Sequence, residues 1–191
     1  ELMSGNEAIA QGAWEAGCTI GVAYPGTPST ETLEAFAKKE GVYAEWCVNE
    51  KVAVEVGIGA SAAGARVLAT MKHVGVNVAA DPLFTAAYTG VGGGMVILAA
   101  DDPGMYSSQN EQDSHYYAQA AAIPCLDPAD SAEALRFTRE AYDISARQPE
   151  PRLLHRLKGQ QHDENLKTVE KGTSVLASEM DQASRAGIIS G

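Results

Sequence analysis

The sequence lacks the cysteine patterns of disulfide and metal proteins. Its three cysteines, Cys18, Cys47 and Cys125, lie far apart, and none stands at the short spacing of a metal-binding or redox pair. We therefore expect buried free thiols instead of a disulfide or a metal site. An iron–sulfur cluster held by this segment alone is excluded, because a cluster needs about four thiolates in a tight array.

Basic residues and long apolar runs are also scarce. The 14 Lys and Arg are outnumbered by 25 Asp and Glu, for a formal net charge of −11, and they do not cluster, so nucleic acid is not an expected partner. The longest apolar stretches, such as Met95–Ala100, are far below the roughly 18 residues that span a bilayer. No charged segment followed by an apolar one opens the chain. We expect a cytoplasmic protein with no membrane segment.

Motifs for covalent catalysis are missing too. The sequence has no nucleophile elbow and no phosphate loop of the Walker type. The small-residue run 57–64 follows a helical stretch instead of a strand, which disfavours a nucleotide-binding Rossmann protein. Close helix packing, within the subunit or across a dimer, explains this run better. The chain therefore either only binds something or depends on a cofactor for its reactivity.

What the sequence does contain is an alternation of helical and strand patterns. Helices are expected at 4–17, 29–39, 50–63, 76–88, 116–121 and 131–146, and strands at 19–23, 43–48, 66–71, 94–100 and 124–126. Ser4 and Glu7 have capping-box spacing at the start of the first helix. Strands separated by helices indicate an α/β fold, a three-layer parallel sheet with helices on both faces.

The pattern weakens after residue 148. Pro149 and Pro151 break the last helix, and Leu153-Leu154 could start a final strand. Residues 158–170 are mostly charged and amide residues. The chain length allows one full hydrophobic core but not two typical domains. We predict one domain over residues 1–157 and an unassigned tail or arm over residues 158–191.

Unusual residues gather directly after the predicted strands, at 24–29, 48–50, 71–75 and 100–113. The carboxyl ends of parallel strands share one edge of a sheet, where loops and helix N-termini present unpaired N–H groups. We therefore predict a ligand site at this edge.

Glu50 is the carboxylate of most interest there. It lies in the first turn of a predicted helix built otherwise of apolar and small residues. The helix dipole alone favours a glutamate at that position. In apolar surroundings, the carboxyl could instead share a proton with a bound heterocycle, as buried catalytic carboxyls do. Glu55, four residues after Lys51, is expected to be a solvated ion-pair partner of that lysine.

The other polar residues of this edge also have two interpretations. Lys72 and His73 end a strand, where a histidine is as often a structural residue as a ligand contact. Asp101 and Asp102 precede Pro-Gly, so an Asx-type turn is favoured over metal binding. The neutral cluster 107–110 suits a polar organic ligand, although a surface loop has the same composition.

Four long motifs occur in order along the chain: YPGTPS at 24–29, EWCVNEKVA at 45–53, TMKHVGVNVAADP at 70–82 and ADDPGMYSSQNEQD at 100–113. Over about residues 2–147, the chain resembles the pyrimidine-binding domain of indolepyruvate:ferredoxin oxidoreductase alpha subunits. That resemblance implies a thiamine-diphosphate-binding fold and the oxidative decarboxylation of an aryl 2-oxoacid. Coenzyme A would take the acyl group, and ferredoxin would take the electrons through iron–sulfur clusters.

The resemblance also implies roles for individual residues. Glu50 matches the family's catalytic glutamate, which hydrogen-bonds the aminopyrimidine ring and shares a proton with it. Cofactor contacts would come from Pro25, Gly26, Thr27, Glu50 and Val74. Substrate contacts would come from Thr27, Lys72, His73, Gln109 and Asn110. No metal ligand is expected in this chain.

Parts of the family pattern are not found in this sequence. The Gly-Asp-Gly motif that holds the diphosphate through Mg²⁺ is missing, as is the cysteine-rich cluster segment. Mg²⁺ and the clusters are therefore expected on other domains or subunits, and the chain is expected to work with a diphosphate-binding partner in a dimer or hetero-oligomer. A fragment, a split subunit and a degenerate relative all fit this pattern. Two alternative functions stay open: a non-catalytic pyrimidine-type module, and a component of a non-oxidative thiamine-dependent 2-oxoacid decarboxylase.

Overall fold

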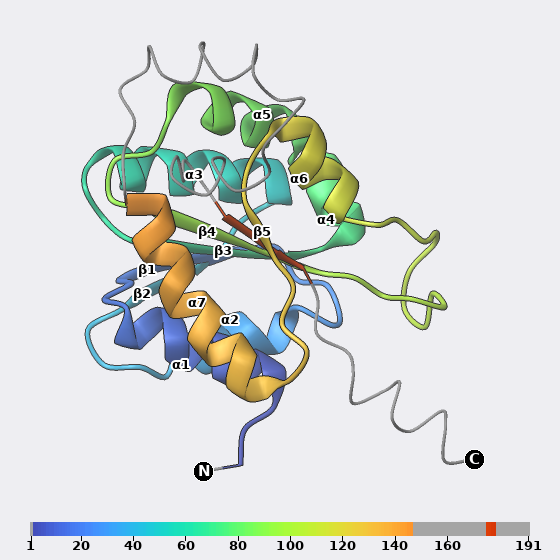
Figure 1. The fold of residues 1–191 in the computed structure, drawn as a ribbon, viewed down its shortest axis with the longest axis horizontal. Coiled ribbons are helices and arrows are strands. Elements are labelled where there is room, and N and C mark those ends of the chain that lie inside the picture. The colour runs from blue at the N-terminus through green and yellow to red at the C-terminus, as the bar shows by residue number, and fades with distance from the viewer. Residues whose placement is uncertain (1, 147–174, 179–191) are drawn as a thin grey trace, which may run out of the picture.

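The computed structural model describes residues 2–146 and 175–178, which form a parallel sheet between two layers of helices (Figure 1). Neighbouring strands run parallel in the order β2-β1-β3-β4-β6-β5. The strands are β1 (Ile20–Ala23), β2 (Tyr43–Trp46), β3 (Val67–Lys72), β4 (Met95–Ala100), β5 (Cys125–Leu126) and β6 (Val175–Ser178). This architecture confirms the predicted three-layer α/β fold.

The helices divide between the two faces of the sheet (Figure 1). One face is covered by α1 (Gly5–Glu15), α2 (Thr30–Phe36) and α7 (Ser131–Ala146). The other is covered by α3 (Glu50–Ala62), α4 (His73–Val78), α5 (Ala80–Thr89) and α6 (His115–Ala121). Among the described residues, no helix is both long enough and apolar enough to cross a membrane.

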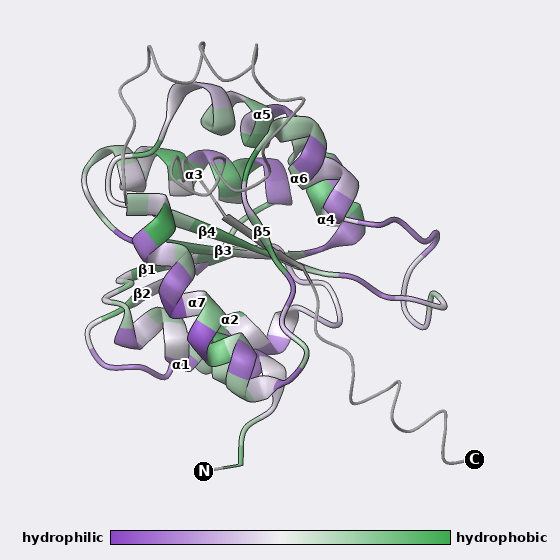
Figure 2. Ribbon diagram, viewed as in Figure 1, coloured by the Kyte–Doolittle hydropathy of each residue, from purple (hydrophilic) through white to green (hydrophobic). Residues whose placement is uncertain are grey.

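Each face of the sheet has its own hydrophobic core, because successive strand residues point to opposite sides. On β4, Met95 and Ile97 pack with α3 and α5, whereas Val96 and Leu98 pack with α1 and α7. All six residues of β4 are buried. Figure 2 shows the central strands in the green of hydrophobic residues, as expected for parallel strands that are covered on both faces.

The first helix begins as its sequence predicts. The Ser4 hydroxyl accepts a hydrogen bond from the Glu7 N–H, and the Glu7 carboxylate accepts one from the Ser4 N–H at 2.9 Å, which completes the capping box. These hydrogen bonds from Ser4 hold the pKa of Glu7 below its usual value. The predicted bounds of α7 also agree with the structure.

The predicted helix 76–88 is wrong in one respect, because the structure has two helices there. The first, α4, begins at His73, and a break at Ala79 separates it from α5. Pro82 explains the break: proline has no N–H to donate to a preceding turn, and it is tolerated only in the first turn of a helix. Starting a new helix at Ala80 places Pro82 in that first turn.

Cys18 and Cys47 are buried, Cys125 is half-buried, and none of the three forms a disulfide. Burial raises the pKa of the Cys18 thiol to about 11, so this thiol is unreactive at neutral pH. In the run 57–64, an added Cβ at Gly57 would lie 2.8 Å from the Met95 side chain, whereas the space beside Gly59 is open. Packing within the subunit therefore explains Gly57.

The segment predicted to be a tail contributes one strand. β6 (Val175–Ser178) pairs with β4 on one side and with β5 on the other, so these residues belong to the sheet. Its strand pattern was not recognised in the sequence. The rest of the predicted tail, and the strand start predicted at Leu153-Leu154, lie outside the described residues.

The strand order has a switch point beside β1. From β1 the chain moves outward to β2 and then returns to the other side of β1 to form β3. In open parallel sheets, ligands bind at such a switch point, outside the carboxyl ends of the strands. Ala23 of β1 lies beside Thr70 of β3, so the segments that follow these two strands emerge side by side.

Candidate functional site

Glu50 opens α3 on the edge where the strands end. The Asn49 side chain caps this helix by accepting a hydrogen bond from the Val52 N–H at 2.9 Å, which fixes where the helix begins. Only 8% of the Glu50 residue is exposed, but its carboxylate oxygens are not sealed from solvent: the buried side-chain atoms without a partner in the described residues are Thr70 Oγ1 and His73 Nδ1. No hydrogen bond or ion pair from the described residues reaches its carboxylate. By contrast, Lys51 and Glu55 form the predicted exposed ion pair at 3.9 Å, and Lys51 also contacts Asp81 at 3.1 Å.

Gly75 of α4 makes room for the Glu50 carboxylate. A Cβ added at Gly75 would lie 2.7 Å from both Cγ and Oε1 of Glu50, and 2.9 Å from Cβ of Met71. Any side chain at position 75 would therefore push against the carboxylate. The α3 and α4 helices meet at this contact, and the glycine is what lets them do so.

Lys72 connects the segment after β1 with the loop after β4. Its ammonium donates hydrogen bonds to the Ser107 carbonyl at 3.0 Å and to the Ser108 hydroxyl at 3.2 Å. A Cβ added at Gly26 would lie 3.4–3.5 Å from the Lys72 side chain, so the aliphatic stem passes beside this glycine. The Ser107 hydroxyl donates a hydrogen bond to the Thr27 carbonyl at 3.1 Å. Three predicted site segments thus meet.

The segment 24–29 is held by hydrogen bonds from its own residues, from α2 and from α1. The Gly26 N–H donates to the Thr30 hydroxyl at 2.9 Å, and the Ser29 hydroxyl donates to the Gly26 carbonyl at 2.7 Å. The Asn6 side chain, from the first helix, donates to the Pro28 carbonyl at 3.0 Å. Asn6 was missed in the sequence because nothing in its local pattern points to a segment more than 20 residues away.

The loop 101–114 is organised by two aspartates. The buried Asp102 carboxylate accepts hydrogen bonds from the N–H groups of Tyr106 and Ser107 and from the hydroxyl of Ser108, at 2.8–3.2 Å. Burial raises the pKa of Asp102, but these hydrogen bonds outweigh it and hold the pKa below the usual value. Asp101 accepts from the N–H and hydroxyl of Ser114, and burial raises its pKa. Both carboxylates therefore shape the loop.

His73 begins α4 and contacts the same loop. Its ring is fully buried, and Nε2 lies 2.8 Å from the Asn110 carbonyl oxygen. Nδ1 is also buried and has no hydrogen-bond partner among the described residues. The neighbouring Val74 is half-buried.

The structure therefore brings most of the predicted site residues together at one edge of the sheet. Lys72, His73 and Val74 lie where β3 passes into α4, and Gly26 and Thr27 follow β1 beside them. Glu50 begins α3 at this edge, and the exposed members of the set are Pro25, Thr27, Gln109 and Asn110. Gly75 was not predicted from the sequence as the packing partner of Glu50.

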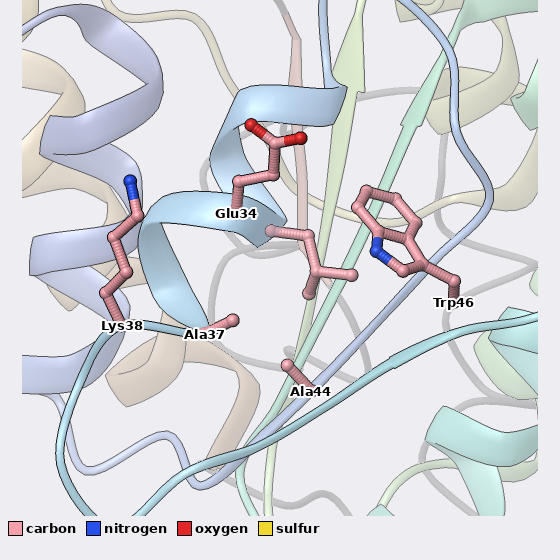
Figure 3. A pocket seen from close by; sticks show the side chains of 6 residues that line it. Glu34, Ala37, Lys38, Ala44 and Trp46 are labelled. Atoms are coloured by element: carbon pink, nitrogen blue, oxygen red, sulfur yellow. The ribbon is translucent and has the colours of Figure 1, made fainter.

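An open cavity of about 350 Å³ lies elsewhere, between α2 and the edge strand β2 (Figure 3). Figure 3 shows Trp46 facing it from β2, Glu34 on α2 and Lys38 in the turn that follows α2. The remaining lining residues are Leu33, Ala37 and Ala44. None of the predicted site residues lines this cavity, so it is separate from the candidate site.

Comparisons with known proteins agree with this arrangement. The family model described as "Pyruvate flavodoxin/ferredoxin oxidoreductase, thiamine diP-bdg" matches residues 11–170. The indolepyruvate oxidoreductase subunit IorA of Archaeoglobus fulgidus is 50% identical over 160 residues, which cover 80% of this chain and 26% of the relative. The IorA subunit of Thermococcus kodakarensis is 51% identical over 147 residues, which cover 75% of this chain and 23% of the relative. The chain spans about a quarter of the length of these relatives.

A solved structure shares the fold. It is 2-oxoglutarate:ferredoxin oxidoreductase from Magnetococcus marinus, with 2-oxoglutarate, coenzyme A and succinyl-CoA bound. The similarity has a TM-score of 0.69 and covers 92% of this chain and 28% of that chain. At 18% sequence identity, the match concerns the fold alone.

Proposed function

The chain belongs to the thiamine-diphosphate-binding family of pyruvate flavodoxin/ferredoxin oxidoreductases, and on that basis we propose that it supplies the pyrimidine-binding half of a thiamine diphosphate site. The complete enzyme would oxidatively decarboxylate aryl 2-oxoacids of the indolepyruvate type to acyl-CoA. The relatives that are about 50% identical are named indolepyruvate oxidoreductase subunits, which supports this substrate class.

The observation that carries the proposal is the state of Glu50. Most of the residue is buried, whereas its carboxylate oxygens are not among the buried atoms without a partner, so the carboxylate can be reached by a bound group. The described residues leave the Glu50 carboxylate without a hydrogen bond, and Gly75 leaves room for it. An accessible carboxylate without a protein partner fits a flat heterocycle that carries one proton on a ring nitrogen.

In the proposed site, Glu50 holds the aminopyrimidine ring by sharing a proton between its carboxylate and a ring nitrogen. Pro25, Gly26, Thr27 and Val74 would flank the ring. When bound, thiamine diphosphate supplies the electron sink for loss of CO2 from the 2-oxoacid. The chain's own contribution is to orient the ring, exclude water from around the carboxylate and keep the shared proton in place.

The substrate would bind on the Lys72 side. An ammonium group has three N–H donors, and Lys72 uses two of them on Ser107 and Ser108. The third is available for the carboxylate of a 2-oxoacid. Thr27 and the exposed side chains Gln109 and Asn110 would complete this side of the pocket. The ring of His73 is fully buried, so its contribution to substrate binding would be indirect.

The site would be completed by other parts of the enzyme. A diphosphate-binding domain or subunit would carry Mg²⁺, and cluster-binding segments would pass electrons to ferredoxin. The length of the relatives, about four times the matched part, supports such additional domains. Association of two copies near the 57–64 helix, where Gly59 faces open space, and a cytoplasmic location complete the proposal.

The test compares Glu50→Gln with Glu55→Gln in the complete enzyme. Glu55 lies on the same helix but is exposed, so its variant is a matched control for the loss of one charge. Indolepyruvate-dependent dye reduction should fall at least about 100-fold in Glu50→Gln and stay within about twofold of wild type in Glu55→Gln. Full activity in Glu50→Gln would contradict the assigned role.

Calorimetry with thiamine diphosphate and Mg²⁺ separates the alternatives. Binding that requires the diphosphate-binding partner supports a half-site. Absence of binding both by the chain alone and by the chain with this partner would favour a non-catalytic module. Release of CO2 without dye reduction would indicate a non-oxidative decarboxylase.

A further inference from the structure

The loop 101–114 contacts α4 through Asn110 and Gln112, and Asn110 is bonded both to α4 and to Gln112. The buried His73 ring contacts the Asn110 carbonyl oxygen at 2.8 Å. The Gln112 side chain donates to the Asn110 side-chain oxygen at 2.8 Å. Gln112 itself accepts from the Tyr117 hydroxyl at 2.9 Å, and Tyr117 accepts from the Asn77 amide. Both ends of this arrangement, His73 and Asn77, belong to α4.

The contact with Asn110 decides which nitrogen of His73 carries the proton. A carbonyl oxygen only accepts hydrogen bonds, so Nε2 must be the donor. In a neutral ring Nδ1 is then the acceptor, and it is buried with no partner among the described residues. An unsatisfied buried acceptor is unfavourable. An apolar side chain of similar size would avoid that penalty, and what it would lack is the hydrogen bond to the loop.

We propose that His73 is a positioning residue, which fixes the loop 101–114 at the carboxyl edge of the sheet through the Asn110 carbonyl. Asn110 follows directly after Ser107, Ser108 and Gln109, and the first two of these accept the hydrogen bonds from Lys72. Holding Asn110 therefore holds the acceptors that aim the Lys72 ammonium. This inference rests on the proposed function, because it is the 2-oxoacid that the aimed ammonium and the loop would bind.

The test compares His73→Gln with His73→Met in the complete enzyme. The two replacements have nearly the same shape, but only glutamine can donate a hydrogen bond from a position close to that of Nε2. Hydrogen exchange followed by mass spectrometry reads the loop directly. In His73→Met, exchange of the amides at 104–112 should accelerate by about five- to tenfold, as expected for the loss of one partly buried hydrogen bond. His73→Gln should stay close to wild type.

Steady-state kinetics provides the functional readout. His73→Met should raise KM for the 2-oxoacid by about tenfold and leave kcat within about twofold, and His73→Gln should restore KM. A purely structural role would produce the same defect in both variants, in proportion to their stability, and that result would overturn the inference. Unchanged loop exchange in His73→Met would overturn it too. If methionine is not accommodated, His73→Asn, which is smaller and carries its amide nearer the backbone, replaces it as the variant without a donor at Nε2.

The exchange measurement needs neither cofactor nor substrate. If amide exchange in the loop accelerates in His73→Met but the enzyme does not bind thiamine diphosphate, the positioning contact is supported and the proposed function is rejected. Activity that depends on Glu50, together with a loop that is unaffected in His73→Met, would do the reverse.

Discussion

Replacing Gly75 with alanine tests whether the shape of the site serves Glu50. The added Cβ would lie 2.7 Å from Cγ and Oε1 of Glu50 and 2.9 Å from Cβ of Met71, closer than the 3.0 Å that real Cβ contacts respect. Met71 is buried in the central strand β3 and cannot retreat. The Glu50 side chain can move, because no hydrogen bond from the described residues holds it. Alanine should therefore displace the carboxylate.

The expected change in the free energy of unfolding for Gly75→Ala follows from two opposing effects. Alanine is favoured over glycine inside a helix by about 0.5–1 kcal/mol. Overpacking a tight contact costs about 1–3 kcal/mol. Gly75→Ala should therefore lower the free energy of unfolding by about 1–2 kcal/mol. Denaturant unfolding measures this change. In the complete enzyme, 2-oxoacid oxidation should fall by at least about tenfold, because Glu50 no longer meets the ring.

A double-mutant cycle with Glu50→Ala shows whether Glu50 or Met71 causes the cost of the added Cβ. Without the Glu50 carboxylate, only the contact with Met71 remains, so the cost of Gly75→Ala should shrink by about 1 kcal/mol. An equal cost in both backgrounds would show that Met71 is the obstacle. Wild-type stability and activity in Gly75→Ala would refute the reasoning about the glycine.

Two further predictions concern pH and the loop 101–114. Because the folded-state pKa of Asp102 is lowered, its stabilisation of the loop is present above the ordinary value of 3.8 and is lost as the pH falls through the lower folded value. Loop exchange in an acid titration should accelerate there, and Asp102→Asn should loosen the loop already at neutral pH and abolish the acid transition. At the loop's end, burial lowers the pKa of His115, but Asp113 and Asp127 outweigh it and raise the pKa above 6.5. The stabilisation from His115 is therefore full below 6.5 and is lost as the pH rises through the folded value, so unfolding midpoints of His115→Gln and wild type should converge at alkaline pH.

Local contacts were predictable because their partners are close in the sequence. The capping box of Ser4 and Glu7 needs only three residues of chain, and the bounds of α7 follow from its apolar stripe. The order of strands and helices placed Glu50, Lys72 and His73 at the same edge of the sheet before any contact was known. The break at Ala79 shows the limit of this reasoning. The helical periodicity of the sequence continues through Ala79, but Pro82 requires a new helix to begin at Ala80.

The alternation of patterns and the four motifs by themselves determined the fold class, the family resemblance and the edge that carries the site. Tertiary structure alone decided that Gly75 accommodates the Glu50 carboxylate, that Asp102 and Lys72 share the 107–108 segment, and that β6 belongs to the sheet. The physical reason is distance along the chain. A contact between residues 25 or more positions apart, such as that of Gly75 with Glu50, depends on how the strands are ordered and how closely the helices pack, and neither leaves a local pattern in the sequence.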